Sequence, residues 1–329
     1  MRDNPGLKTI VVAGDKGKSH PVFGKNKAFL DVGGLPLIAH VLKALEEAQS
    51  IAEIYIVGPK GKLEEVLSRN LASALSKPVR VFEQSSNLYE NIWNTFMETL
   101  PANQREETAK SEGGPCADSV VLVVGSDMPL LTGAEVDEFV AKCDMDEYDC
   151  VVGVTREEIL QHYYPAENRA GIRLAYLHFS DGNLRQNNMF LVRPFKVHNR
   201  GYIQTMYDLR YQKEFANIAR LAWEILRKEE GGWGALGNYL LLQLSLLFSR
   251  LHFGFMRDLI RRITHIDSVV KCISRLLQTR FSYACTSLGG AALDVDREHE
   301  YESIKARFSE WMNYQKQKAA EMAGRGSSL

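Results

Sequence analysis

The chain has few cysteines and no surplus of charge of either sign. Five cysteines occur in 329 residues, and none of them forms a CxxC pair or another spacing typical of zinc ligands. The formal net charge is −1, from 40 basic and 41 acidic residues, which argues against a nucleic-acid partner held by a global basic field. The few cysteines indicate reduced structural thiols. The balanced net charge means that any bound anion must be held by a local cluster of basic residues.

Long uninterrupted apolar runs are also absent. No apolar segment typical of a secretory signal precedes the first predicted strand, so a cytoplasmic protein is expected. The most apolar stretch, 235–256, has about the length of a short membrane span, but polar residues interrupt it and arginines follow it directly. A buried helix is the favoured interpretation, and a helix on a membrane surface, peripheral to the bilayer, is the alternative.

Residues 9–155 alternate between short β-branched runs and amphipathic helical patterns. Strands are expected at 10–13, 54–57, 79–82, 120–124, 150–154 and 188–192, and helices at 36–49, 63–76, 88–100, 133–143 and 298–315. The polar, glycine-containing segment 102–118 is expected to be an exposed loop. The alternation predicts a Rossmann-like α/β fold, with a mostly parallel sheet and helices on both faces. In such sheets, ligands bind beyond the carboxyl ends of the strands.

The character of the sequence changes after residue 200. Residues 201–285 have the pattern of successive amphipathic helices, which predicts an α-helical insertion that serves substrate selection or interaction with a partner. The α/β core is assigned to 1–200. The chain returns to the core over 286–315, with an acidic segment and a last helix, and 316–329 is expected to be a frayed tail.

Three clusters carry the candidate chemistry, and the first is a loop directly after the strand at 10–13. This loop contains glycines together with Lys16, Lys18, Lys25 and Lys27. A buried strand that leads through a flexible cationic loop into a helix is suited to holding phosphates. Taken alone, a solvated surface loop is an equally good interpretation. The spacing of the glycines does not match a P-loop.

The second and third clusters are acidic. Asp127 follows a very apolar strand directly and is placed to hold Mg²⁺, which prefers oxygen ligands. The alternative is a carboxylate that only shapes the turn before the helix whose start Thr132 and Glu135 mark as a capping box. Asp294 and Asp296 occupy alternate positions of an extended segment and therefore point the same way. One could be a second metal ligand while the other caps the following helix, or both could be surface acids.

Taken in this order, the clusters resemble the nucleotidyltransferase family with the GT-A-like fold. The likeness is strongest to its molybdenum-cofactor guanylyltransferase and cytidylyltransferase-like proteins. The opening glycine- and lysine-containing motif of that family is similar to residues 12–37, its G-D-x-P-x-L metal loop to Ser126–Leu131, and its closing acidic segment to Asp294–Tyr301. The resemblance covers residues 7–195 and 286–312 and leaves the predicted insertion uncovered.

The resemblance implies a Mg²⁺-dependent enzyme that transfers a nucleotidyl group from an NTP, with GTP or CTP favoured, to a small-molecule acceptor bearing a phosphate or hydroxyl group. It implies nucleotide binding by Ala13, Gly14, Lys16, Gly17, Gln84 and Asn91, metal ligation by Asp127 with Asp294 or Asp296, and catalysis by Lys27 and Lys18. The predicted insertion would then select the acceptor, and its stretch 235–256 would contact a lipid-like acceptor, a membrane surface or a second copy of the chain.

Two other functions stay open. A glycosyltransferase of the GT-A architecture is disfavoured, because those enzymes typically carry a D-x-D after the central strand, where this chain has Ser126 and Asp127. A catalytically silent nucleotide-binding or scaffold protein is the second alternative. It is motivated by Asp15, which replaces a glycine of the family motif, and by Ser19, which stands at the usual arginine position.

Overall fold

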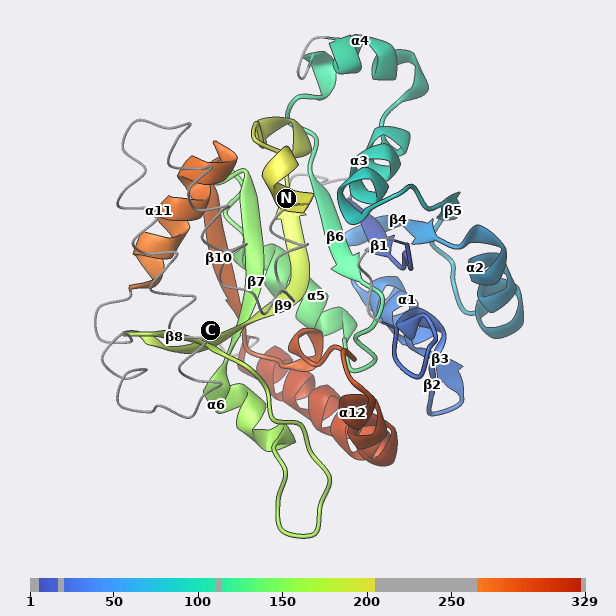
Figure 1. Cartoon of the computed structure of the whole chain (residues 1–329), viewed down its shortest axis with the longest axis vertical. Coiled ribbons are helices and arrows are strands. Elements are labelled where there is room, and N and C mark those ends of the chain that lie inside the picture. The colour runs from blue at the N-terminus through green and yellow to red at the C-terminus, as the bar shows by residue number, and fades with distance from the viewer. Residues whose placement is uncertain (1–5, 17–20, 111–113, 205–264, 327–329) are drawn as a thin grey trace.

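The computed structural model describes residues 6–16, 21–110, 114–204 and 265–326. Its centre is an eight-stranded sheet with the order β10-β7-β9-β6-β1-β4-β5, to which β8 is added beside β9 (Figure 1). The strands are β1 (Leu7–Val12), β4 (Ile51–Gly58), β5 (Val79–Glu83), β6 (Val121–Gly125), β7 (Cys150–Arg156), β8 (Leu177–Phe179), β9 (Gly182–Val192) and β10 (Phe281–Thr286), and the short strands β2 (Asp31–Val32) and β3 (Leu35–Pro36) pair separately.

Helices surround this sheet. The α-helices are α1 (Leu37–Glu47), α2 (Lys60–Val66), α3 (Leu88–Thr99), α4 (Arg105–Lys110), α5 (Gly133–Lys142), α6 (Glu157–Leu160), α11 (Ile266–Leu277) and α12 (Glu298–Gly326). Two 3₁₀ turns matter for the site, η1 (Lys27–Phe29) and η7 (Gly290–Ala292). The long helix α12 passes close to the hairpin of β2 and β3 (Figure 1).

Strand alternation divides the core between the two faces of the sheet. Val11 and Val124 pack with residues of α1 and α5 on one face, whereas Ile10 and Val123 pack with Phe96 of α3 on the other. Further along that second face, α11 packs over β7 and β10. Helices therefore cover both faces, and the α/β fold predicted from the sequence is confirmed.

The sheet is mostly parallel, as the sequence predicted. β1 is parallel to β4 and β6, β5 is parallel to β4, and β10 is parallel to β7. The exception is β9, which lies antiparallel between β6 and β7. Because β6 and β7 both oppose β9, the parallel strands end at one common edge of the sheet, where α/β proteins bind ligands.

Three assignments made from the sequence are wrong. β10 is a strand of the core sheet although 201–285 was expected to be a helical insertion, and the core already resumes with α11 at residue 266. A helix, α4, lies within 102–118, which was expected to be a loop. α12 continues through most of 316–329, which was expected to be a frayed tail. Pairing with β7 decides β10, and no local sequence pattern contains that partner. Residues 105–110 and 316–326, in contrast, consist largely of amino acids with high helix propensity, so their helices follow from the local sequence.

Several expectations concern residues outside the described part of the chain. Gly17 and Lys18 belong to this group, as does the stretch 235–256 within 205–264. The predicted role of that stretch at a lipid, a membrane surface or a second copy therefore stays a prediction. Within the described ranges, no helix combines the length and the apolar character needed to span a membrane.

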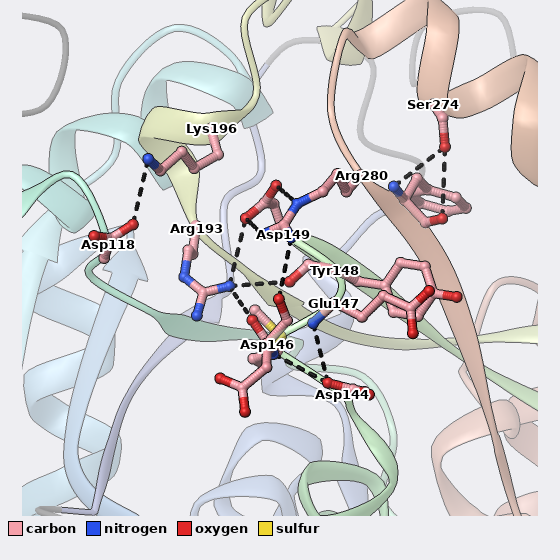
Figure 2. Close-up of polar contacts among 12 residues, drawn as sticks. Asp118, Asp144, Asp146, Glu147, Tyr148, Asp149, Arg193, Lys196, Ser274 and Arg280 are labelled. Carbon is pink, nitrogen blue, oxygen red and sulfur yellow. Dashed lines mark hydrogen bonds and ion pairs between the residues drawn. The ribbon is translucent and has the colours of Figure 1, made fainter.

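An ion cluster ties the amino-terminal ends of β7 and β10 to the end of β9 (Figure 2). Asp149 is 5% exposed, and its carboxylate accepts hydrogen bonds from Nε and Nη2 of Arg280 at 2.6 and 2.7 Å. Nη1 of Arg193 lies 3.4 Å from the same carboxylate and also donates to the carbonyl of Tyr148 at 3.0 Å. The hydrogen bonds from Arg280 outweigh the effect of burial and hold the pKa of Asp149 below its ordinary value. The cluster lies at the edge opposite the strand ends where ligands bind, which suits a structural role.

Candidate active site

Four segments meet at the carboxyl edge of the sheet. They are the loop after β1, the segment after β5, the loop after β6 and the segment that follows β10. Each begins where a parallel strand ends, so segments far apart in the sequence become neighbours. All three clusters singled out from the sequence lie in these segments.

Amide side chains hold the loop after β1. Oε1 of Gln84 accepts from the backbone N–H of Asp15 at 2.8 Å and of Lys16 at 3.4 Å, and Nε2 of Gln84 donates to the Asp15 carboxylate at 2.6 Å. Gly14 lies directly against Asn91, because a Cβ atom at Gly14 would come within 2.7 Å of the Asn91 Nδ2. The structure therefore brings together four of the residues predicted to bind the nucleotide, and it turns the Asp15 carboxylate toward Gln84.

Asn26 connects β1 to Lys27, and sequence reasoning did not identify it. Its Nδ2 donates to the carbonyl of Ala13 at 3.0 Å, and its Oδ1 accepts from the N–H of Ala28 at 3.0 Å, which caps the turn η1. Lys27 is the first residue of that turn. Ala13 is buried, and its own N–H donates to the Val57 carbonyl at 2.8 Å. Ala13 and Asn26 thus fix the position from which Lys27 enters the site.

The three predicted metal ligands form one cluster around Lys27. Nζ of Lys27 lies 2.6 Å from Oδ2 of Asp127 and 2.6 Å from Oδ1 of Asp296. One carboxylate oxygen from each of Asp127, Asp294 and Asp296 lies within 4.8 Å of the others. A backbone hydrogen bond of 3.0 Å, from the N–H of Val295 to the carbonyl of Asp127, joins the two acidic segments. Residues separated by more than 160 positions therefore share one site.

Arg185 of β9 completes the cluster, and it too was missed in the sequence. Its Nη2 lies 2.7 Å from Oδ1 of Asp294, and its Nε donates to the carbonyl of Ala292 at 2.8 Å. An isolated arginine in a strand carries no pattern that reveals such a role. The three carboxylates are consequently not equivalent, because Asp294 is paired with Arg185 whereas Asp127 and Asp296 share Lys27.

The charged groups in this cluster shift each other's pKa. Burial disfavours the charge of Lys27, but the carboxylates of Asp127 and Asp296 outweigh it and raise the pKa of Lys27 above its ordinary value. Burial raises the pKa of Asp127, Lys27 opposes that rise, and the nearby Asp294 and Asp296 add to it. Three carboxylates thus face two cationic side chains, and the remaining negative charge favours a further cation.

The oxygen donors of this cluster fit Mg²⁺. Mg²⁺ prefers carboxylate oxygens, and it is typically held by one or two carboxylates together with substrate phosphates. Asp127 and Asp296, which share Lys27, can supply these carboxylates, and Asp294 lies beside them in its ion pair with Arg185.

Fold and site together define an α/β protein of the GT-A-like class, with its functional groups gathered at the carboxyl edge of the sheet. The family model for the MobA-like NTP transferase domain matches residues 9–187, more than half of the chain. The chain belongs to this family. The matched region contains the Gly14 loop, Lys27, Asp127 and Arg185.

Curated relatives carry the name 2-C-methyl-D-erythritol 4-phosphate cytidylyltransferase. The protein from Chlorobium luteolum is 23% identical over 139 residues, which cover 42% of this chain and 54% of the relative. The protein from Pelodictyon phaeoclathratiforme is 30% identical over 131 residues, which cover 39% of this chain and 49% of the relative. The chain thus spans about half the length of these two relatives.

A solved structure supports the fold. The structure of a hypothetical transferase from Thermus thermophilus superposes with a TM-score of 0.57 at 22% sequence identity, covering 90% of this chain and 99% of that chain. At this level of identity the likeness concerns the arrangement of helices and strands alone. It agrees with the mixed sheet and the helices on both of its faces.

Proposed function

We propose that this protein is a Mg²⁺-dependent nucleotidyltransferase, which transfers NMP from an NTP to a small-molecule acceptor and releases pyrophosphate. The observation that carries the proposal is the meeting of Lys27 with Asp127 and Asp296, at 2.6 Å each, beside the glycine-containing loop after β1. Such an arrangement would serve as a phosphate-binding loop, a partly buried cation and oxygen ligands for a metal at one edge of the sheet.

The loop after β1 would bind the triphosphate. The Lys16 ammonium, which donates to the Gln84 carbonyl at 3.3 Å, would provide positive charge, while Gln84 and Asn91 hold the loop in place. Lys18 and Gly17, which lie outside the described residues, are proposed to contribute to the same site. A substituent at Gly14 would meet Asn91, so Gly14 keeps the loop and the segment after β5 in contact.

Mg²⁺ would be held by Asp127 and Asp296, with Asp294 as the third carboxylate of the set. When bound, the metal would neutralise phosphate oxygens and stabilise negative charge in the transition state. Arg185 keeps Asp294 in place through a 2.7 Å ion pair, so the acidic segment holds its shape. Lys27, which contacts Asp127 and Asp296 at 2.6 Å each, would turn its ammonium group toward a phosphate oxygen once the metal engages these carboxylates.

The reaction would be an in-line displacement at the α-phosphorus. An oxygen of the acceptor, from a phosphate or hydroxyl group, forms the new bond to phosphorus, and the bond to the β-phosphate bridging oxygen breaks. The pyrophosphate leaves with the electron pair of that bond, and an acceptor hydroxyl, if that is the group that attacks, releases its proton to water. Lys27 stabilises the charge that develops on the phosphoryl oxygens, so positioning and electrostatics replace a dedicated protein nucleophile.

CTP is the first nucleotide to test, since the named relatives are cytidylyltransferases, and GTP is the second because of the family. The acceptor is proposed to be a phosphorylated or hydroxyl-bearing small molecule. The experiment measures pyrophosphate released from each NTP with Mg²⁺ and a panel of sugar phosphates, alcohol phosphates and cofactor precursors. Release that depends on one NTP and one acceptor supports the proposal, whereas nucleotide binding without release across the panel favours a scaffold, and consumption of an NDP-sugar favours a glycosyltransferase.

Residues 205–264 are proposed to contribute to acceptor selection, with the stretch 235–256 as the part that would meet a lipid-like acceptor, a membrane surface or a second copy. The motivation is the apolar sequence followed by arginines. Flotation of the full chain with neutral and anionic vesicles tests the lipid version, and sedimentation tests the dimer. Any deletion used as a control should be limited to 205–264, because α11 and β10 belong to the core. A chain that stays out of the vesicle fraction and sediments as a monomer would remove these roles.

A further inference from the structure

Glu135 is a fully buried carboxylate that the proposed reaction does not use. It lies in the first turn of α5 and has 0% exposure. The capping box expected from the sequence is half present, because the Thr132 hydroxyl accepts from the N–H of Glu135 at 3.3 Å. The Glu135 carboxylate, however, reaches across to the segment after β10. Its Oε2 accepts from the N–H of Ala291 at 3.0 Å, and its Oε1 accepts from the Thr286 hydroxyl at 3.4 Å.

Ala291 is the middle residue of η7, the turn that leads directly into the second acidic segment. The same turn is held from other elements. With its amide oxygen turned toward the turn, Gln315 of α12 accepts from the N–H of Gly290 at 2.6 Å, and Arg185 of β9 donates to the carbonyl of Ala292 at 2.8 Å. Buried side chains of α5, α12 and β9 thus bind successive residues of one turn.

The contact between the two acidic segments is close as well as polar. A Cβ atom at Gly290 would lie 2.0 Å from the carbonyl oxygen of Leu130, which follows Asp127 in its loop. The loop after β6 therefore touches η7, and α5, which continues that loop, sends Glu135 into the same turn. Asp127 and the segment of Asp294 and Asp296 are consequently linked through a few buried residues.

Keeping a carboxylate in this interior position is costly. Burying a charged group without a cationic partner is strongly unfavourable, and burial raises the pKa of Glu135 to about 8. Below that pH the side chain is a neutral carboxylic acid. What it adds beyond packing is two oxygens that reach a backbone N–H at 3.0 Å and a hydroxyl at 3.4 Å on two different parts of the segment after β10.

We infer that Glu135 is a positioning residue, which fixes the second acidic segment relative to Asp127 and thereby sets the affinity of the site for a divalent cation. This inference rests on the proposed function for the identity of the cation site. Glu135 acts through the N–H of Ala291 and makes no contact of its own with the three carboxylates. Residues that orient metal ligands in this way typically contribute about 10–100-fold to metal affinity.

The test compares wild type with Glu135→Ala, Glu135→Gln and the matched variant Glu138→Gln. Glu138 lies one turn further along α5, and its carboxylate accepts from the N–H of Ser287 at 2.9 and 3.0 Å, upstream of η7. Two quantities are measured on the full chain. One is the affinity for Mn²⁺ alone by electron paramagnetic resonance, and the other is amide hydrogen exchange in peptides spanning 287–297 without metal.

Glu135→Ala is expected to weaken Mn²⁺ binding about tenfold and to speed exchange in 287–297. Glu135→Gln should recover part of both effects, and Glu138→Gln should leave the Mn²⁺ affinity within twofold of wild type. A folded Glu135→Ala variant with unchanged exchange in that segment overturns the inference, as does unchanged Mn²⁺ affinity. If wild type itself fails to bind Mn²⁺, the proposed metal site fails, and the exchange measurement still decides whether Glu135 holds the segment.

Discussion

The buried Glu135 makes the stability of this protein depend on pH in an unusual direction. Burial raises its pKa to about 8 from an ordinary 4.5, although the hydrogen bond from Ala291 acts in the opposite sense. Between these two pH values the folded protein binds a proton that the unfolded chain releases. The stabilisation is therefore fully present below about pH 4.5 and is lost as the pH rises toward 8. Glu135→Gln removes this titration.

The size of the effect follows from the difference between the two pKa values. Each unit corresponds to about 1.4 kcal/mol, so the full difference amounts to on the order of 5 kcal/mol. Relative to Glu135→Gln, wild type should lose unfolding free energy steadily between pH 5 and pH 8. At pH 5 the unfolding free energy of Glu135→Gln should consequently be equal to or lower than that of wild type. Above pH 8 it should be higher, even if the amide replaces the hydrogen bond to Ala291 imperfectly.

Urea denaturation at pH 5, 6, 7, 8 and 9, followed by tryptophan fluorescence, measures this difference. Trp311 has 0% exposure and provides a buried reporter. The slope of unfolding free energy with urea should be the same for both proteins, so that a shift of midpoint reports stability. Glu138→Gln controls for the loss of a carboxylate from the same helix. Stability curves of wild type and Glu135→Gln that run parallel from pH 5 to pH 9 would refute the reasoning.

Three further changes test other parts of the molecule. Asp149→Asn should lower the unfolding free energy by roughly 2 kcal/mol at pH 7. Because the folded pKa of Asp149 is lowered, wild type should lose this advantage as the pH falls through that pKa, and urea midpoints measured in steps from pH 7 downward follow the loss. Lys27→Ala should reduce kcat about 100-fold or more, whereas Lys271→Gln, which changes an exposed lysine of α11, should leave it nearly unchanged. Similar rates for the two variants would contradict the role of Lys27. Gln84→Ala should weaken NTP binding about tenfold, because the hydrogen bonds to the loop are lost. Calorimetric titration measures the affinities, and Asn94→Ala is the control. An equal loss of affinity in both variants would remove the specific role of Gln84.

The sequence predicted the central strands of the sheet better than the edge strand β10. The β-branched runs at 10–13 and 120–124 are central strands, and their local pattern suffices because neighbours on both sides bury them. Among the described residues, β10 pairs only with β7, and its buried and partly exposed residues do not alternate regularly. Pairing with a partner about 130 residues away supplies its stability, and no local window contains that partner.

The candidate site likewise contains residues that the sequence reveals and residues that it does not. Asp127 and Lys27 could be predicted because each stands in a short motif with a recognisable neighbourhood. Arg185, Glu135 and Asn26 could not, since each acts through a contact with a distant or irregular segment. Their residue types are common in strands, first turns of helices and loops. Only the folded chain shows that they hold the groups that the motifs contain.

Pyrophosphate release by wild type and by Asp127→Asn, with CTP or GTP, Mg²⁺ and the acceptor panel, tests the central claim most directly. Asp127→Asn keeps the shape of the side chain while removing one of the two carboxylates that contact Lys27. The proposed mechanism predicts Mg²⁺-dependent release by wild type and a loss of at least about 100-fold in the variant, whose folding is checked by circular dichroism. Release that is equal in the two proteins, or that continues without a divalent cation, would contradict it.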